Sequence, residues 1–293
     1  MANMANFLGI QHDRAQFEKS PFVIMQIPYD HTTSYKSGAR YGPKAIIDAS
    51  HHLEEFDEEL ELEISEHINI YTHAPLEINE LDPCKIILDI KSFAEIVFKN
   101  KKIPVLLGGE HTITLGNIFS AKTYFDPFTL LYCDAHSDLR DIYNGTQYNH
   151  ACVSKRALDN GIHIVQVGIR SLSKDEHELI KKNRISVYYA NKLKNEKDWI
   201  ENITPELKEK VYISIDLDCL DPSIMPSVGT PEPGGMSWEY LTAMLRYICE
   251  NREIIGFDVV ELSPINGIVA PNFLAAKLVY KLIGYISKGM GFL

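Results

Sequence analysis

The sequence predicts an α/β fold in which a largely parallel sheet is covered by helices on both faces. Short apolar runs recur along the chain, and most are continuous rather than alternating, as expected of strands buried on both faces. They span residues 22–27, 68–73, 104–109, 129–133, 164–169, 185–190, 211–215 and 254–260. Helical patterns fill many of the gaps, and strands that alternate with helices form parallel sheets through right-handed crossovers. The expected architecture therefore has three layers, α/β/α.

Apolar spacing and start signals locate several of the helices. Residues 43–56 place apolar side chains from Ile46 to Phe56 on one helical face, and residues 84–99 repeat that spacing. Helix starts are signalled by Pro43, by Ser173 with Glu176 in capping-box spacing, by Ser237 and by Pro271. There is no internal repeat and no linker-like stretch, so we expect residues 1–293 to form a single domain.

Composition narrows the class of protein. The chain is 45% hydrophobic and 24% charged, and no apolar segment approaches the roughly 18 residues of a membrane span. The N-terminus has no secretory pattern, and five cysteines without C-x-x-C spacing suit reduced thiols. We therefore expect a cytoplasmic protein that does not bind membranes.

Acidic residues outnumber basic ones. The formal charge of −11 argues against nucleic acid as a partner, because phosphates require basic patches. Residues 54–67 hold much of this charge and are interpreted as a solvated turn after a helix, with attraction of a cationic substrate as the alternative.

Polar clusters follow four of the apolar runs, where ligands bind in a parallel sheet. They are GGEHTIT at 108–114, DAHSDLRD at 134–141, DLDCLDP at 216–222 and ELSP at 261–264. Their common placement after strands makes one shared site plausible.

The clusters contain the ligand types of a metal centre. Alternate residues of an extended segment point the same way, so Asp134, His136 and Asp138 can converge, as can Asp216 and Asp218. With His111 they make four carboxylates and two imidazoles, a hard donor set that suits Mn²⁺. Four adjacent negative charges would repel unless two divalent ions balanced them. Each motif alone occurs by accident in strand ends and turns, but their combination predicts a two-metal centre.

These motifs, together with GTPEPGG at 229–235, resemble in order and spacing the signatures of the ureohydrolases, the arginases and agmatinases among them. The resemblance runs from residue 32 to residue 264. It implies an arginase-like α/β/α fold around a parallel eight-stranded sheet, two manganese ions per subunit, hydrolysis of a guanidino group to urea and an amine, and assembly into trimers or hexamers. It also implies that the metal ligands are His111, Asp134, His136, Asp138, Asp216 and Asp218.

The resemblance assigns further roles by position. His150 matches the histidine that protonates the departing amine, and Glu261 matches the acid that pairs with the substrate guanidinium. Asp138 is expected both to bind metal and to hydrogen-bond the attacking water. Glu110 stands where many members have aspartate, and we expect little consequence. Tyr143 and Asn144 are expected at the rim of the pocket for the substrate tail.

Loop sequences favour agmatine, which would give putrescine and urea. The stretch DLRDIYNGTQYNH resembles the agmatinase form and lacks the threonine- and serine-rich stretch of arginases. Ser171 and Ser173 replace two aspartates that arginases use for the substrate amine, and the capping box accounts for Glu176. Arginine and 4-guanidinobutanoate remain alternative substrates. Two alternative functions from other classes of protein remain: a two-metal phosphoesterase and a catalytically silent metal-binding relative.

Overall fold

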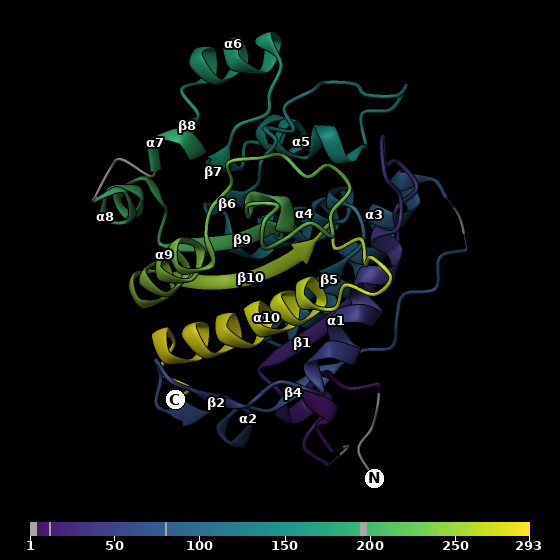
Figure 1. The fold of residues 1–293 in the computed structure, drawn as a ribbon, viewed down its shortest axis with the longest axis vertical. Helices are drawn as coiled ribbons and strands as arrows, with labels where there is room; N and C mark the ends of the chain where they lie inside the picture. Colours follow the sequence, from purple (N-terminus) through teal and green to yellow (C-terminus); the bar gives the residue numbers. More distant parts are fainter. Residues whose placement is uncertain (1–4, 12, 80, 194–197) are drawn as a thin grey trace.

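A computed structural model of the protein describes residues 5–11, 13–79, 81–193 and 198–293. The strands of its main sheet are β1 Phe22–Ile27, β4 Ile70–Thr72, β5 Ile103–Gly108, β6 Thr129–Cys133, β7 His163–Ile169, β8 Ser186–Tyr189, β9 Lys210–Asp216 and β10 Glu253–Val260. They lie in the order β4-β1-β5-β10-β9-β6-β7-β8, and every neighbouring pair is parallel (Figure 1). The predicted parallel eight-stranded sheet is confirmed.

Helices form a layer on each face of this sheet. On one face α1 Gly42–Ser50, α9 Trp238–Asn251 and α10 Ala270–Gly289 pack together, and on the other α3 Pro83–Lys99, α4 Thr114–Phe125 and α5 Val153–Asp159 do so (Figure 1). The remaining helices are α2 Ile64–His67, α6 Lys174–Asn183, α7 Ala190–Leu193 and α8 Trp199–Ile203, and a hairpin joins β2 Phe56–Asp57 to β3 Leu62–Glu63. Short 3-10 turns are η1 Phe7–Gly9, η2 Phe17–Lys19, η3 Ala39–Tyr41, η4 His111–Ile113, η5 His150–Cys152, η6 Thr204–Glu206 and η7 Leu217–Cys219. The three-layer arrangement is as predicted.

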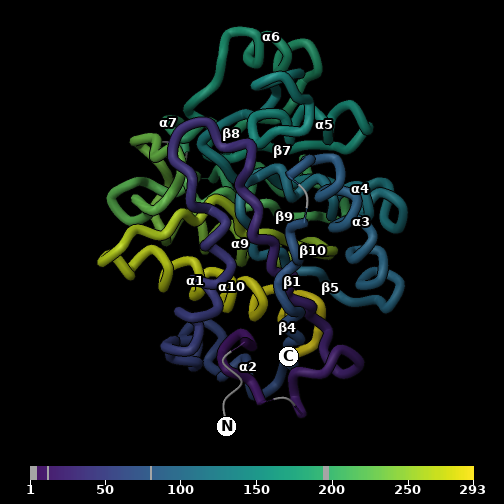
Figure 2. Tube along the Cα trace, turned by 90° about the vertical axis from the view of Figure 1, so that its right-hand side faces the viewer, coloured from purple at the N-terminus to yellow at the C-terminus, as the bar shows by residue number. Residues whose placement is uncertain are grey.

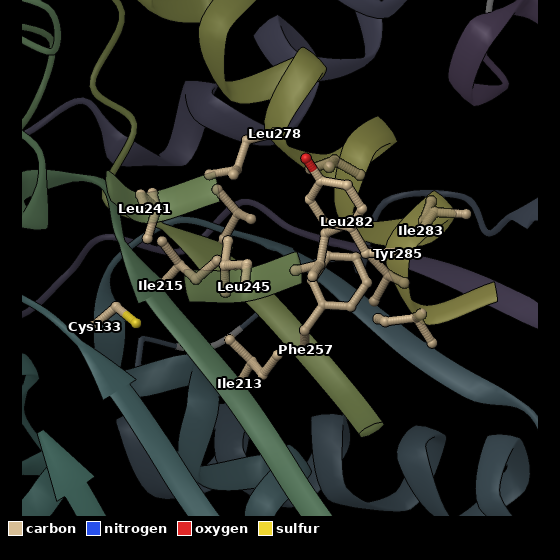
Figure 3. Close-up of a cluster of buried hydrophobic side chains, with 14 of the residues drawn as sticks. Cys133, Ile213, Ile215, Leu241, Leu245, Phe257, Leu278, Leu282, Ile283 and Tyr285 are labelled. Carbon is tan, nitrogen blue, oxygen red and sulfur yellow. The ribbon is translucent and has the colours of Figure 1, made fainter. Parts of the chain in front are cut away.

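The strands are apolar on both faces because each face meets a helical layer. In β9, Ile213 and Ile215 belong to the core under α9 and α10, whereas Tyr212 belongs to the core beside α4 and α5. Figure 3 shows Leu245 and Phe257 among the side chains that fill the first of these cores. Burying one such side chain stabilises the fold by about 1.5–3 kcal/mol, so these two cores hold the sheet rigid beneath its carboxyl ends.

The predicted helix starts are largely confirmed. Ser173 and Glu176 form a complete capping box at α6, and Ser237 accepts a hydrogen bond from the backbone of Tyr240 at α9. Pro271 lies in the first turn of α10. No helix in the described ranges is long and apolar enough to cross a membrane.

The expected helix at 43–56 is too long. Helix α1 ends at Ser50, and Phe56 is 54% exposed in β2. Asp57 is fully buried, and its carboxylate lies 3.0 Å from Lys281 Nζ of α10. The chain leaves the helical path to make this tertiary ion pair, so the interpretation of residues 54–67 as a solvated turn is wrong at Asp57.

Candidate metal centre and cavity

The predicted ligands meet at the carboxyl ends of neighbouring central strands. His111 begins η4 three residues after the end of β5, Asp134 follows β6, and Asp216 is the last residue of β9. Asp218 lies in η7, two residues after the end of β9, and Glu261 follows β10. Since the sheet order is β5-β10-β9-β6, residues far apart in sequence converge on one edge.

Two groups of ligand atoms are close enough to hold one metal ion each. The first contains His111, Asp134 and Asp216, and the second contains Asp134, His136 and Asp218. His111 Nδ1 lies 3.0 Å from Asp134 Oδ2 and 3.3 Å from Asp216 Oδ2. His136 Nδ1 lies 2.9 Å from Asp218 Oδ2 and 3.5 Å from Asp134 Oδ1. Asp134 is shared, so the geometry suits a pair of ions with a common carboxylate.

Asp138 belongs to neither group but lies beside the first. Its Oδ2 is 3.8 Å from His111 Nδ1 and accepts a 2.7 Å hydrogen bond from the Tyr132 hydroxyl. Its φ is +50°, a conformation that residues other than glycine adopt at some energetic cost. The surrounding structure therefore holds this side chain toward the centre.

The electrostatics of the cluster favour bound cations. Burial, and then the charge of Asp134, raises the pKa of Asp138, while burial and the charges of Asp218 and Asp134 raise the pKa of Asp216. Among the described residues, no group hydrogen-bonds the buried Asp134 Oδ2 with acceptable geometry. Buried carboxylates without full hydrogen bonding are costly unless a cation neutralises them. The donor set and this unpartnered oxygen fit two divalent ions.

A buried network orients His111. Its Nε2 lies 2.8 Å from Ser214 Oγ, which donates a 2.6 Å hydrogen bond to Asp258 Oδ1. Tyr212 donates to the other oxygen of Asp258 at 2.9 Å. Because the Ser214 proton goes to Asp258, Ser214 accepts the Nε2 proton of His111, which leaves Nδ1 free for a metal ion.

A cavity of about 320 Å³ opens above this cluster. Its lining includes the predicted site residues His111, His136, Asp138, Tyr143, His150, Asp216, Asp218 and Glu261. Asn144 is exposed and lines a neighbouring recess with His31, Thr146 and Asn149 instead. The structure thus brings together all predicted site residues except Asn144, with Asp134 buried beneath the floor.

His150 lies beside the cavity, held by the segment between β1 and α1. Its Nδ1 is 3.3 Å from Thr32 Oγ1 and its Nε2 is 3.4 Å from Ser34 Oγ. Figure 2 shows this segment, in purple, rising from β1 and turning back to α1. Burial, and then the positive charges of His136 and His111, lowers the pKa of His150 to about 4. At neutral pH this imidazole is therefore uncharged.

Glu261 is buried next to the cluster and is held tightly. Its Oε1 accepts a 2.7 Å hydrogen bond from the backbone N–H of His111, and its φ is +67°. Burial, followed by the charge of Glu110, raises the pKa of Glu261 to about 8. A cation in the cavity would favour the ionised form, so this position suits recognition of a guanidinium.

Several polar residues and thiols near the site have structural partners or are buried. Glu176 accepts hydrogen bonds from Ser173 N and from Leu139 N, so both of its oxygens are occupied. Asp221 accepts from three backbone N–H groups and fixes a turn. Cys133 and Cys219 are buried free thiols.

Sequence reasoning missed Thr32, Tyr132, Ser214 and Asp258 as parts of the site. A signal existed for Ser214, because alternate strand positions 214 and 216 point the same way. A second signal was Asp258, a carboxylate inside an otherwise apolar strand. Neither signal says which partner each side chain meets.

Comparison with known proteins identifies relatives over most of the chain. A model of the Arginase family matches residues 20–284. An N(1)-aminopropylagmatine ureohydrolase of Synechocystis sp. is 38% identical over 269 residues, which cover 90% of this chain and 88% of the relative. An agmatinase of Pyrococcus horikoshii is 34% identical over 90% of this chain and 91% of the relative.

Solved structures share the fold. The agmatine ureohydrolase of Thermoplasma volcanium superimposes with a TM-score of 0.86 at 33% identity, covering 95% of this chain and 94% of that one. Proclavaminate amidino hydrolase from Streptomyces clavuligerus gives a TM-score of 0.90 at 26% identity, with 98% of each chain covered.

Proposed function

Because the chain belongs to the arginase family and is a ureohydrolase of that family, we propose that it hydrolyses a linear guanidinoalkylamine to urea and an amine. The observation that carries this proposal is the pair of ligand groups sharing Asp134 at the floor of the cavity. We assign the first ion to His111, Asp134, Asp138 and Asp216, and the second to Asp134, His136 and Asp218. Two bound Mn²⁺ ions supply the activation of a water as nucleophile at neutral pH.

The protein's own residues then bind and orient the substrate. The carboxylate of Glu261 pairs with the guanidinium through charge-assisted hydrogen bonds. Asp138 accepts a hydrogen bond from the attacking water. The imidazole of His150 delivers a proton to the departing amine, and Tyr143 borders the tail, its ring 5.9 Å from that of His150.

Agmatine is the first candidate substrate, giving putrescine and urea. Ser171 and Ser173 line the cavity where an α-amine would otherwise require acids. Glu176, the nearby acid, has both oxygens engaged by backbone N–H groups. A substrate without an α-carboxylate and α-amine suits this wall, which also argues against arginine.

A second candidate is agmatine extended by an aminopropyl group. Its support is the 37% and 38% identity to ureohydrolases named for N(1)-aminopropylagmatine in Thermus thermophilus and Synechocystis sp.. The cavity also continues to Tyr35, a residue that is 83% exposed, so a longer cationic tail has a route to solvent. Asn144, in the adjoining recess, is a candidate contact for such a tail.

The test is urea release by manganese-loaded protein offered agmatine, its aminopropyl derivative, arginine and 4-guanidinobutanoate at equal concentration. Urea mainly from one of the first two supports the proposal and chooses between them. Urea mainly from arginine or 4-guanidinobutanoate would refute the substrate assignment, but it would still support hydrolysis of a guanidino group to urea. Asp134→Asn should lose metal and activity together, and full activity in that variant would refute the shared-ligand assignment.

We also propose that the protein assembles into a homotrimer or hexamer. Light scattering on the purified protein gives the molar mass directly, and a monomer of 33.3 kDa would refute this part.

A further inference from the structure

A single hydroxyl joins a buried acid to the histidine beside the cavity. Thr32 Oγ1 lies 2.6 Å from Glu110 Oε1 and 3.3 Å from His150 Nδ1. The three residues come from separate segments, after β1, after β5 and within η5. Their convergence is therefore a product of the fold and not of local sequence.

Proton counting gives the direction of these hydrogen bonds. Glu110 is completely buried and accepts from Thr32 N, Thr32 Oγ1 and Thr112 Oγ1, each at 2.6 Å. A threonine hydroxyl has one proton to donate, and when Glu110 is ionised Thr32 gives that proton to the carboxylate. Toward His150, Thr32 Oγ1 can only accept, and it also receives the backbone N–H of His150 at 3.3 Å. The proton between Thr32 and the imidazole must then belong to Nδ1.

We propose that Glu110 and Thr32 are positioning residues that hold neutral His150 as the Nδ1–H tautomer, with the Nε2 lone pair available to the reaction. This inference rests on the proposed function, in which His150 moves protons. Nε2 takes up one proton from the attacking water as the C–O bond forms. It releases that proton to the amine nitrogen as the C–N bond breaks, and the electron pair of that bond stays on nitrogen.

Glu110, expected from sequence to have little consequence, holds the Thr32 hydroxyl in place. Its side chain accepts from three donors at 2.6 Å each, and one of them is the Thr32 hydroxyl that contacts His150. The low pKa of His150 is consistent with this arrangement, because only a neutral imidazole has a tautomer to fix. A shorter or uncharged side chain at position 110 would leave the Thr32 hydroxyl free to rotate.

The direct test is NMR of the full-length protein labelled with ¹⁵N-histidine at pH 8.5, above the pKa of about 7 of Glu110, with His150→Asn used to find the His150 signal. Wild type and Thr32→Ser should carry the ring proton on Nδ1. Thr32→Val, which keeps the shape but has no hydroxyl, should shift His150 toward the Nε2–H tautomer. A wild-type proton on Nε2, or an unchanged tautomer in Thr32→Val, would overturn the proposal.

Kinetics of the manganese-loaded enzyme provide a second readout. Thr32→Val and Glu110→Gln should lower kcat by about 10- to 100-fold, while KM changes about twofold or less. The loss in kcat is smaller than that expected from removing His150 itself, because the proton-transfer group is still present. Thr32→Ser should restore kcat, and Thr242→Val, a buried hydroxyl in α9, is the matched control. A rise in KM without loss of kcat would overturn the positioning role. If no guanidino compound is hydrolysed, the proposed function fails, but the NMR result still decides the tautomer.

Discussion

Ser214 and Asp258 are register partners on β9 and β10, and Ser214 Oγ lies 2.6 Å from Asp258 Oδ1. The same hydroxyl lies 2.8 Å from His111 Nε2. The pairing of β9 with β10 thus places the Asp258 carboxylate on the Nε2 side of the His111 imidazole, with Ser214 between them. Such outer contacts fix the orientation and basicity of a metal-binding histidine.

Ser214→Ala should weaken the site formed by His111, Asp134 and Asp216. His111 would lose the acceptor for its Nε2 proton, and loss of an outer contact of this kind lowers metal affinity by about 10- to 100-fold. Titration of metal-free protein with Mn²⁺, followed by metal analysis after dialysis, measures the effect. The matched control is Ser120→Ala, since Ser120 Oγ is buried and has no hydrogen-bond partner among the described residues. Equal Mn²⁺ affinity in both variants would contradict the role of Ser214.

Glu176→Ala should destabilise the loop that carries the proposed ligands Asp134, His136 and Asp138. Glu176 accepts from Leu139 N, one residue after Asp138, and from Ser173 N at the start of α6. Removing it leaves a buried N–H unpaired, which costs about 1–3 kcal/mol of unfolding free energy. Ser173→Ala removes only the other half of the cap and should cost about 1 kcal/mol. Urea denaturation compares the two, and a larger loss in Ser173→Ala would refute the proposed link to Leu139.

Lys281→Met should be among the most destabilising single changes outside the site. Lys281 Nζ lies 3.0 Å from Asp57, and both side chains are buried. Leaving the Asp57 charge without its partner costs about 3–5 kcal/mol of unfolding free energy. The control is Lys44→Met, because the exposed Lys44–Asp48 pair is worth about 0.3–0.5 kcal/mol. A loss in Lys281→Met no greater than in the control would show that the buried pair is not needed.

The parts of the structure that could be predicted from sequence are those with local signatures. The strands follow from continuous apolar runs, and the proposed metal ligands follow from alternate positions such as 134, 136 and 138. These patterns survive in the fold because adjacent strands end at the same edge of the sheet. Local spacing therefore placed five of the six proposed ligands, all except Asp138, in the two groups of ligand atoms that could hold a metal ion.

The missed features depend on contacts between distant residues. Glu110 and Thr32 are 78 positions apart, and Asp57 and Lys281 are 224 apart. Which side chains meet across such separations depends on strand register and on the path of loops, and residue spacing does not encode either. The low pKa of His150 was unpredictable for the same reason, since burial and the charges of two other histidines cause it.

Manganese should raise the thermal stability of the protein more at pH 8.5 than at pH 6.5. The pKa values of Glu261 and Glu110, near 8 and 7, are raised above their usual 4.5 first of all by burial. The stability that comes from these protonated carboxyls is present below pH 4.5 and is lost as pH rises through 7 to 8.

The lowered pKa of His150 makes the folded protein less stable as pH falls, which is the opposite of the effect of the two glutamates. This effect of His150 is confined to pH values below about 6.5, where the histidine of the unfolded chain is protonated. Metal-free protein should therefore melt at lower temperature at pH 8.5. Bound cations offset the repulsion between carboxylates, and their affinity rises with pH because the ligands must be deprotonated. Scanning calorimetry with and without Mn²⁺ at both pH values measures the increment, and Asp134→Asn, which lacks the shared ligand, should show almost none. An increment that is equal at the two pH values, or larger at pH 6.5, would mean that protons and metal ions do not compete for this cluster.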